Sequence, residues 1–351
     1  MHIDPYVALA GLLVGFTVGL TGMGGGALMT PILVLLFKIQ PLTAVSSDLV
    51  AAMVMKPVGG GVHARRGTVN WEIVKWLCIG SVPSAFAGVL ILRSLGSGSV
   101  IQSRLKVILG AALLIASTSI VVKSYLQGRR SRRLRNLAAT SQGGADGEGF
   151  RLQTTPTLLI GIVGGLIVGM TSVGSGSLII VCLMMLYPML TSRELVGTDL
   201  VQAIPLVASA ALGHILFGSF QLGLTGSILI GSLPGAYLGA KLSSRAPDGV
   251  IRPALVFVLL ASALKLLNVT TANTGLILLV VTLVGLPLWG MIDAAGRDGP
   301  CWTFVGKSRS RWVRIQALGA PFGVGFVASI VYFARVRPEL EAATVRVLQA
   351  A

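Results

Sequence analysis

The chain has 351 residues, of which 54% are hydrophobic and only 11% charged, and its mean hydropathy is +0.84. A soluble domain carries about 25% charged residues, so this composition excludes an ordinary soluble protein and indicates an all-α polytopic membrane protein. The net charge of +16 would suggest nucleic-acid binding in a soluble chain, but here the basic residues lie between apolar runs, so we expect no nucleic-acid partner.

The first apolar segment, residues 6–37, has neither a basic region before it nor a small-residue cleavage site after it, so we do not expect a cleavable signal peptide. As one straight helix the segment would be roughly 46 Å long. That length exceeds a hydrocarbon core of about 30 Å, whereas two full spans would need about 40 residues. A pair of short or re-entrant helices on either side of a glycine-rich break satisfies both constraints.

Three ordinary spans follow, and the second half of the chain then repeats the order. The predicted spans of the first half are 44–62, 73–92 and 105–122; those of the second half are the broken segment 156–187 and then 196–217, 222–242 and 251–267. Two further apolar segments, 274–291 and 315–334, have no counterpart. The expected organisation is a first transmembrane repeat (1–125), an Arg-rich cytoplasmic linker (126–155), a second repeat (156–268), and two accessory transmembrane helices with a tail (269–351).

The duplication is clearest in the two glycine-broken segments. Gly11–Leu28 reads GLLVGFTVGLTGMGGGAL, and Gly161–Leu178 reads GIVGGLIVGMTSVGSGSL, with glycines and one threonine in register at an offset of 150 residues. At an offset of 151 the sequence Asp-Leu-Val, a histidine and a proline also recur. Glycine-interrupted segments at corresponding places in two halves indicate the binding site of a secondary transporter.

Loop charges indicate how the halves are oriented. In the first half the loop between the second and third spans carries Arg65 and Arg66, whereas the matching loop of the second half, residues 218–221, has no charge. There the next loop is basic instead, with Lys241 and Arg245. Because Lys and Arg concentrate in cytoplasmic loops, we expect inverted repeats, with anionic lipids as further partners of the basic loops.

The glycine-rich breaks are the expected substrate site. Helices that begin after such breaks direct unpaired N–H groups and a positive dipole end toward a small anion, and nearby hydroxyls add donors. The alternative is close helix packing through small residues. The expected substrate-binding residues are Thr21, Gly22, Gly24, Gly25, Gly26, Thr171, Ser172, Gly174, Ser175, Gly176 and Ser177.

Charged and polar residues within the spans are candidates for coupling or gating. Asp48 and Asp199 each follow a small polar residue and would cap a helix or bind a proton in a wet cavity. Lys56, which corresponds to Val207 in the other half, would either extend its ammonium to the membrane surface or pair with an anion or with Asp48.

Two matched pairs complete the set. His63 and His214 would be packed or interfacial residues, or members of a proton relay or substrate site. Pro83 and Pro234 would kink their helices, either for packing or as gates. The three cysteines do not form a C-x-x-C motif, and the sequence has no Walker loop, so we expect no cofactor, no metal and no catalytic residue.

Several of these motifs resemble the sulfite exporter TauE/SafE family of membrane transporters. The resemblance covers about residues 11–267 and is carried by GLTGMGGGALMTP, SSDLVAA, VHARRGTVNW, GSVPSAFAG, VGTDLVQAIPL, GHILFGSFQ and GSLPGAYLG. It implies a bacterial inner-membrane protein that moves small anions such as sulfite, organosulfonates or small carboxylates. The chain departs from the pattern at Ser47, where the second half has Thr198, and in the hydroxyl-rich second break.

Three functions stay open at this point. The first is a secondary transporter that moves a small anion by alternating access, with coupling to protons left open. The second is an intramembrane enzyme in which Asp48 and Asp199 share a proton. The third is a membrane sensor or anchor that binds a partner through the Arg-rich linker.

Overall fold

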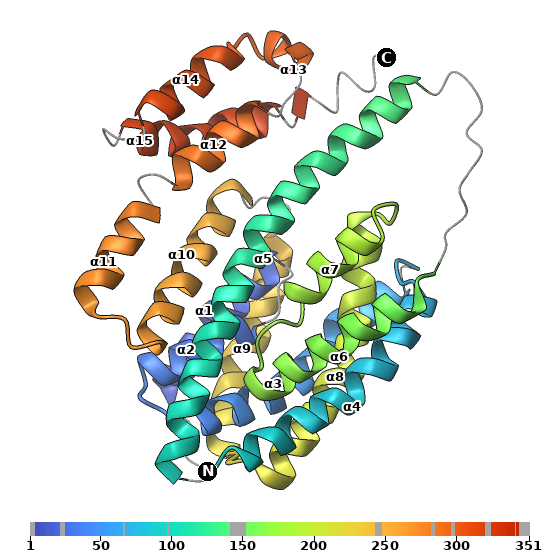
Figure 1. The fold of residues 1–351 in the computed structure, drawn as a ribbon, viewed down its shortest axis with the longest axis vertical. Helices are drawn as coiled ribbons and strands as arrows, with labels where there is room; N and C mark the ends of the chain where they lie inside the picture. Colours follow the sequence, from blue (N-terminus) through green and yellow to red (C-terminus); the bar gives the residue numbers. More distant parts are fainter. Residues whose placement is uncertain are drawn as a thin grey trace. The chain divides into compact units, whose positions relative to one another are not determined.

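The computed structural model describes residues 4–21, 25–65, 67–96, 98–140, 152–242, 248–281, 285–295, 299–319, 324–340 and 342–343. Every regular element in these ranges is a helix, which confirms the predicted all-helical class (Figure 1). The chain divides into two compact units. The first comprises residues 1–123, 144–244 and 262–268, and the second comprises residues 124–143, 245–261 and 269–351.

The first unit holds most residues of the two predicted repeats, whereas residues 245–261 of the second repeat belong to the second unit. The first unit's first half has α1 (Pro5–Thr21), α2 (Gly26–Leu35), α3 (Pro41–Arg65), α4 (Trp71–Ser94) and the beginning of α5 (Gly98–Thr140). Its second half has α6 (Thr154–Thr171), α7 (Leu178–Leu186), α8 (Ser192–Phe217), α9 (Leu222–Leu242) and the end of α10 (Asp248–Leu266). The helices follow the predicted order.

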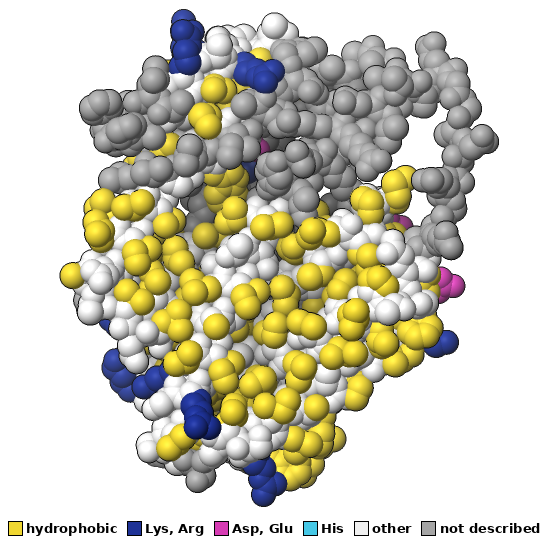
Figure 2. Space-filling model, in the orientation of Figure 1, with side chains coloured by type: hydrophobic (Ala, Val, Ile, Leu, Met, Phe, Trp, Pro, Cys, Tyr) yellow, Lys and Arg dark blue, Asp and Glu magenta, His cyan; other side chains and the backbone are white. Residues whose placement is uncertain are grey.

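Five described helical segments are long and apolar enough to cross a membrane: 71–94, 98–122, 154–171, 193–217 and 222–239. Their outer faces are apolar too, with Leu159, Leu216 and Leu222 each more than half exposed. Figure 2 shows hydrophobic side chains over most of the visible face, with Lys and Arg near its edges. Such a surface requires lipid around it.

Both glycine-broken segments are pairs of helices, as predicted, and the second pair is a hairpin. The Tyr187 hydroxyl, just after α7, lies 2.5 Å from Thr157 Oγ1 and accepts a hydrogen bond of 3.1 Å from the backbone N–H of Gln153, at the start of α6. The end of α7 therefore returns to the level at which α6 begins. With nine residues, α7 is about 14 Å long, less than half of the hydrocarbon core.

Helices of one half pack against helices of the other. α1 packs on α9, α6 packs on α4, and α3 packs on α8, while α3 also contacts α9 and α4 also contacts α8. Exchanging the halves turns each of these pairings into another one that exists. Glycines permit the close approach, since a Cβ at Gly161 would lie 2.5 Å from the carbonyl oxygen of Leu77 and one at Gly11 would lie 2.8 Å from that of Ile228. The repeated glycines Gly11 and Gly161 therefore allow α1 to pack closely on α9 and α6 on α4.

A matched pair of hydrogen bonds shows the same relation between the halves. The backbone N–H of Asn70 donates to Thr198 Oγ1 at 3.0 Å, and the backbone N–H of Gln221 donates to Ser47 Oγ at 3.3 Å. Asn70 and Gln221 directly precede α4 and α9. Each hydroxyl therefore receives the N–H group that comes before a helix of the other half.

The predicted linker differs from expectation in its first part. α5 continues to Thr140, far beyond the predicted span end at 122, so the Arg-rich stretch 129–135 is helical. Arginine and leucine are good helix formers, which lets the helix continue after the apolar residues end. Residues 141–151 lie outside the described residues.

The second unit has more helices than the two predicted for residues 269–351. They are α11 (Thr271–Val280), α12 (Leu286–Ala295), α13 (Gly299–Phe304), α14 (Arg309–Gly319), α15 (Val324–Val331) and the π-helix η4 (Tyr332–Val336). Aromatic side chains hold this unit together: Trp302, Tyr332 and Phe333 are buried, with Trp289 and Trp312 packed against them. Tyr332 also donates a hydrogen bond of 2.7 Å to Asp293.

Candidate substrate site at the glycine loops

The second glycine loop, Ser172–Ser177, joins α6 to α7 through unusual backbone angles. Ser172 ends α6 in the left-handed conformation with φ 60°, and φ is 112° at Gly174 and 100° at Gly176. Residues with a side chain rarely adopt such backbone angles, which explains why positions 174 and 176 are glycines. All six residues are buried, so this loop is non-helical backbone inside the protein.

The start of α2, directly after the first glycine-rich break, contacts the second glycine loop. Gly26, the first residue of α2, lies so close to Ser172 that an added Cβ would collide with the serine's carbonyl oxygen and lie 2.9 Å from its carbonyl carbon. The structure thus brings the start of α2 against the second loop. Gly22 and Gly24 and the side chain of Thr21 are outside the described residues.

Asp48 lies within α3, buried at 4% exposure. Its Oδ2 accepts hydrogen bonds from Thr30 Oγ1 of α2 at 3.0 Å and from Ser172 Oγ at 2.7 Å. This carboxylate therefore connects the first half of the unit to the second loop. Sequence reasoning did not identify Thr30, because nothing in the pattern relates it to a residue 18 positions away.

The helix-capping interpretation of Asp48 and Asp199 is wrong. α3 begins at Pro41, and α8 is capped by Thr191, whose side chain accepts from the N–H of Glu194. Both carboxylates lie inside a helix, and Asp199 is 1% exposed. Burying charge in this way is costly, so such residues are usually paired or functional.

Lys56 is half-buried and directed to the second loop. Its Nζ donates a hydrogen bond of 2.7 Å to Ser175 Oγ, and its charge interacts with both Asp199 and Asp48. These contacts agree with the interpretation of Lys56 as an internal charge partner rather than a side chain that extends to the membrane surface. Lys56 therefore brings a positive charge to the second loop.

His214 is fully buried and bonded through both ring nitrogens. Nε2 lies 2.8 Å from the carbonyl oxygen of Gly169 in α6, and Nδ1 lies 2.8 Å from Ser46 Oγ in α3. A carbonyl oxygen only accepts, so Nε2 carries the hydrogen and Nδ1 of a neutral ring accepts from Ser46. His214 thus holds three helices together. The side chain of His63 is outside the described residues.

The two prolines lie inside helices, Pro83 in α4 and Pro234 in α9. Near the first, Ser209 of α8 donates to the carbonyl oxygen of Val82 at 2.7 Å, and Gln202 donates to Ser81 Oγ at the same distance. α4 is thus tied to α8 beside its proline. These contacts support packing, and the gating hypothesis stays a prediction.

The remaining loop residues differ in how their polar groups are used. Thr171 Oγ1 donates to the carbonyl oxygen of Ile167 at 2.5 Å and accepts from the N–H of Val173 at 3.1 Å, so it braces the turn. The carbonyl oxygen of Gly25 accepts from the N–H of Met29 at 2.9 Å, at the start of α2. Ser177 Oγ is buried and forms no hydrogen bond with any residue that the structure describes.

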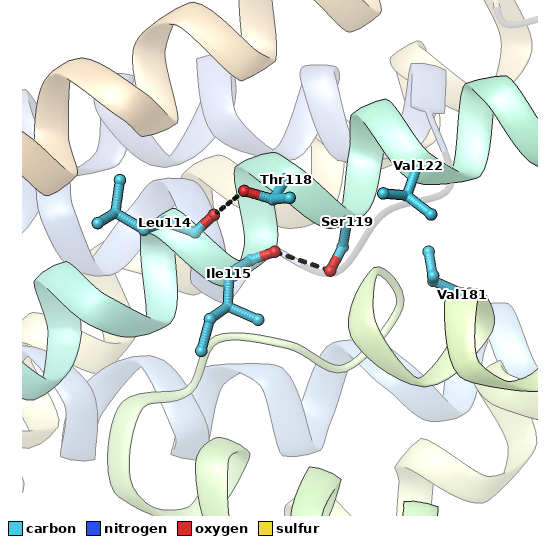
Figure 3. Close-up of a pocket in the computed structure, with 6 residues that line it drawn as sticks. All are labelled: Leu114, Ile115, Thr118, Ser119, Val122 and Val181. Atoms are coloured by element: carbon cyan, nitrogen blue, oxygen red, sulfur yellow. Dashed lines mark hydrogen bonds between the residues drawn. The ribbon is translucent and has the colours of Figure 1, made fainter.

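A separate groove of about 280 Å³ lies between α5 and Val181 of α7 (Figure 3). Its two hydroxyls are already used, because Thr118 donates to the carbonyl oxygen of Leu114 and Ser119 to that of Ile115. The rest of its lining is aliphatic. The groove contains none of the predicted site residues and lacks the charge that an anion needs.

Comparison with known proteins identifies the family. A model of the sulfite exporter TauE/SafE family matches residues 7–266, and no solved structure matches significantly. In Bacillus subtilis (strain 168), the probable membrane transporter protein YjnA is 37% identical over 74% of this chain and 98% of its own length.

Two other proteins of that strain carry similar names. The probable membrane transporter protein YdhB is 26% identical over 74% of this chain and 99% of its own length. The probable membrane transporter protein YunE is 38% identical over 23% of this chain and 28% of its own length. The chain therefore belongs to the sulfite exporter TauE/SafE family and is a membrane transporter of the bacterial plasma membrane.

Proposed function

We propose that this protein is a secondary transporter that binds a small anion where its two glycine loops meet and moves it by alternating access, coupled to protons. The observation that carries the proposal is the contact of Lys56 with Ser175 of the second loop, beside Asp48 and Ser172. An ammonium, loop hydroxyls and the N-terminus of α7 together offer an anion several donors.

The symmetry of the helix pairings supports alternating access. Each broken helix pair packs on the other half, so a rocking motion of one half against the other would change access to the loops between them. The α6–α7 hairpin also leaves and returns at the same level, as one member of an inverted pair of re-entrant segments would. The loop charges of the sequence favour the same inversion.

Proton coupling follows from the charge at the site. Two buried carboxylates and one ammonium carry a net charge of −1, so an anion would bind more readily if one carboxylate also took up a proton. Lys56, on the same helix as Asp48, interacts electrostatically with both Asp48 and Asp199. Asp48 and Asp199 are the proposed proton carriers.

Purified protein in liposomes tests the function. Flux of sulfite, organosulfonates and small carboxylates is measured with and without a proton gradient at a fixed membrane potential. We expect saturable flux of at least one of these anions, accelerated by a proton gradient and strongly reduced by Gly174→Leu, because leucine cannot adopt the backbone angle at this position without strain. Undiminished flux in Gly174→Leu would contradict the site, and no flux of any tested anion would contradict the function.

A further inference from the structure

The two halves of the chain contribute different charges to the site at the glycine loops. Asp48 and Asp199 recur in both halves, but the residue that corresponds to Lys56 is Val207, which is apolar and 1% exposed. Within the described parts of the chain, Lys56 is the ammonium that reaches these loops, and its hydrogen bond goes to the second loop. The two loops cannot be equivalent toward a charged substrate.

Two serines of the second loop have hydroxyl groups that could bind a substrate together with Lys56. Ser175 accepts a hydrogen bond from Lys56, and Ser177, two residues later, lies directly before α7 with its hydroxyl buried. Ser177 Oγ has no hydrogen-bond partner within the described parts of the chain. Buried hydroxyls are almost always bonded, so an unbonded one beside a helix N-terminus marks a place for a ligand atom.

The balance of charge sets a limit on that ligand. With both carboxylates ionised, Lys56 offsets one of them, so the cluster carries −1 before binding, −2 with a bound monoanion and −3 with a bound dianion. A proton taken up by one carboxylate makes each of these values less negative by one, and the difference between the two kinds of anion stays the same. Uncompensated charge becomes more costly at each step in a site removed from water. A dianion therefore adds one more uncompensated charge to this cluster than a monoanion does.

We infer, on the basis of the proposed function, that Lys56 and Ser177 form the specificity-determining part of the site and select singly charged oxyanions over dianions. The ammonium binds the charged group of the substrate, and Ser175 and Ser177 donate to its oxygens.

Competition in proteoliposomes tests this selectivity. Methanesulfonate and acetate serve as monoanions, and sulfate and thiosulfate serve as dianions, each measured for uptake and for inhibition of the others. In the wild-type protein we expect a preference of about tenfold or more for a monoanion. A wild-type preference for either dianion would overturn the inference even though it would leave the transporter function standing.

Two variants separate binding from folding. Lys56→Gln is expected to lower the uptake of the preferred monoanion by about a hundredfold, with partial rescue in Lys56→Arg, whereas Lys75→Gln, at an exposed lysine of α4, serves as the matched control. Ser177→Ala removes an unbonded hydroxyl, so we expect an unchanged or higher melting temperature together with a several-fold higher KM. A wild-type KM in either Lys56→Gln or Ser177→Ala would overturn the inference, and a wild-type protein that moves none of the probes would overturn the proposed function as well.

Discussion

At the scale of single residues, the site depends on backbone contacts that tolerate no added atom. Gly26 begins α2 against the carbonyl group of Ser172, and the same serine donates through its hydroxyl to Asp48. One residue of the second loop therefore fixes both the approach of α2 and the position of a buried carboxylate. A small displacement of Ser172 would alter both contacts together.

Gly26→Ala is expected to destabilise the protein by about 1–3 kcal/mol, because the methyl group must displace backbone rather than a side chain. The matched control is Gly61→Ala in α3, where a Cβ would meet nothing within 4 Å. Alanine favours helix by about 0.5–1 kcal/mol over glycine, so the control should be neutral or stabilising. Melting temperatures in detergent measure both, and equal values for the two variants would contradict the close contact.

His214→Gln tests whether this histidine relays protons or holds helices together. An amide can still donate to the carbonyl oxygen of Gly169 and accept from Ser46, with poorer geometry, so we expect a loss of about 1–3 kcal/mol in stability. The pH dependence of flux should keep its wild-type shape, because a histidine that only holds helices together does not set that dependence. A profile that loses its pH dependence at wild-type stability would instead support the relay.

At the scale of helices, the sequence predicted the number and order of the helices in the two repeats, but not the contacts between them or the full length of α5. Glycine spacing and segment length were enough to anticipate the α1–α2 and α6–α7 pairs, since both are local properties. The contacts of Asp48 with Thr30 and Ser172 and of His214 with Ser46 join distant residues, so no local pattern reveals them. The continuation of α5 was missed because an apolar pattern marks only the part of a helix that lies in lipid.

The α6–α7 hairpin predicts that both of its ends face the same side of the membrane. In a variant with Cys78, Cys182 and Cys301 replaced by alanine, single cysteines at Thr154 and Met189 should react with a membrane-impermeant maleimide from one side only, and from the same side. Phe217→Cys, at the far end of the spanning helix α8, should react from the opposite side. Labelling of residues 154 and 189 from opposite sides would contradict a re-entrant hairpin.

At the scale of the whole molecule, the main pairings between the two halves are conserved when the halves are exchanged, which indicates a common plan for both. The crossed hydrogen bonds of Asn70 with Thr198 and of Gln221 with Ser47 follow that plan, whereas Lys56 and Val207 depart from it. The helix packing is thus similar in the two halves, whereas the positive charge of Lys56 is present in the first half alone. A transporter built in this way can use equivalent motions in its two halves and still bind its substrate in one orientation.

The proposed inversion of the repeats makes a prediction that is independent of any substrate. Gln40 follows α2, Met189 follows α7, and both are exposed at matching places in the two halves. If the repeats are inverted, single cysteines at these positions, in the same cysteine-free background, should react with the impermeant maleimide from opposite sides of the membrane, because the two hairpins then enter from opposite faces. Inside-out and right-side-out vesicles provide the two sides, and Phe217→Cys provides the orientation control. Reaction of both positions from the same side would show that the repeats are parallel, and the charge asymmetry of the loops would then need another explanation.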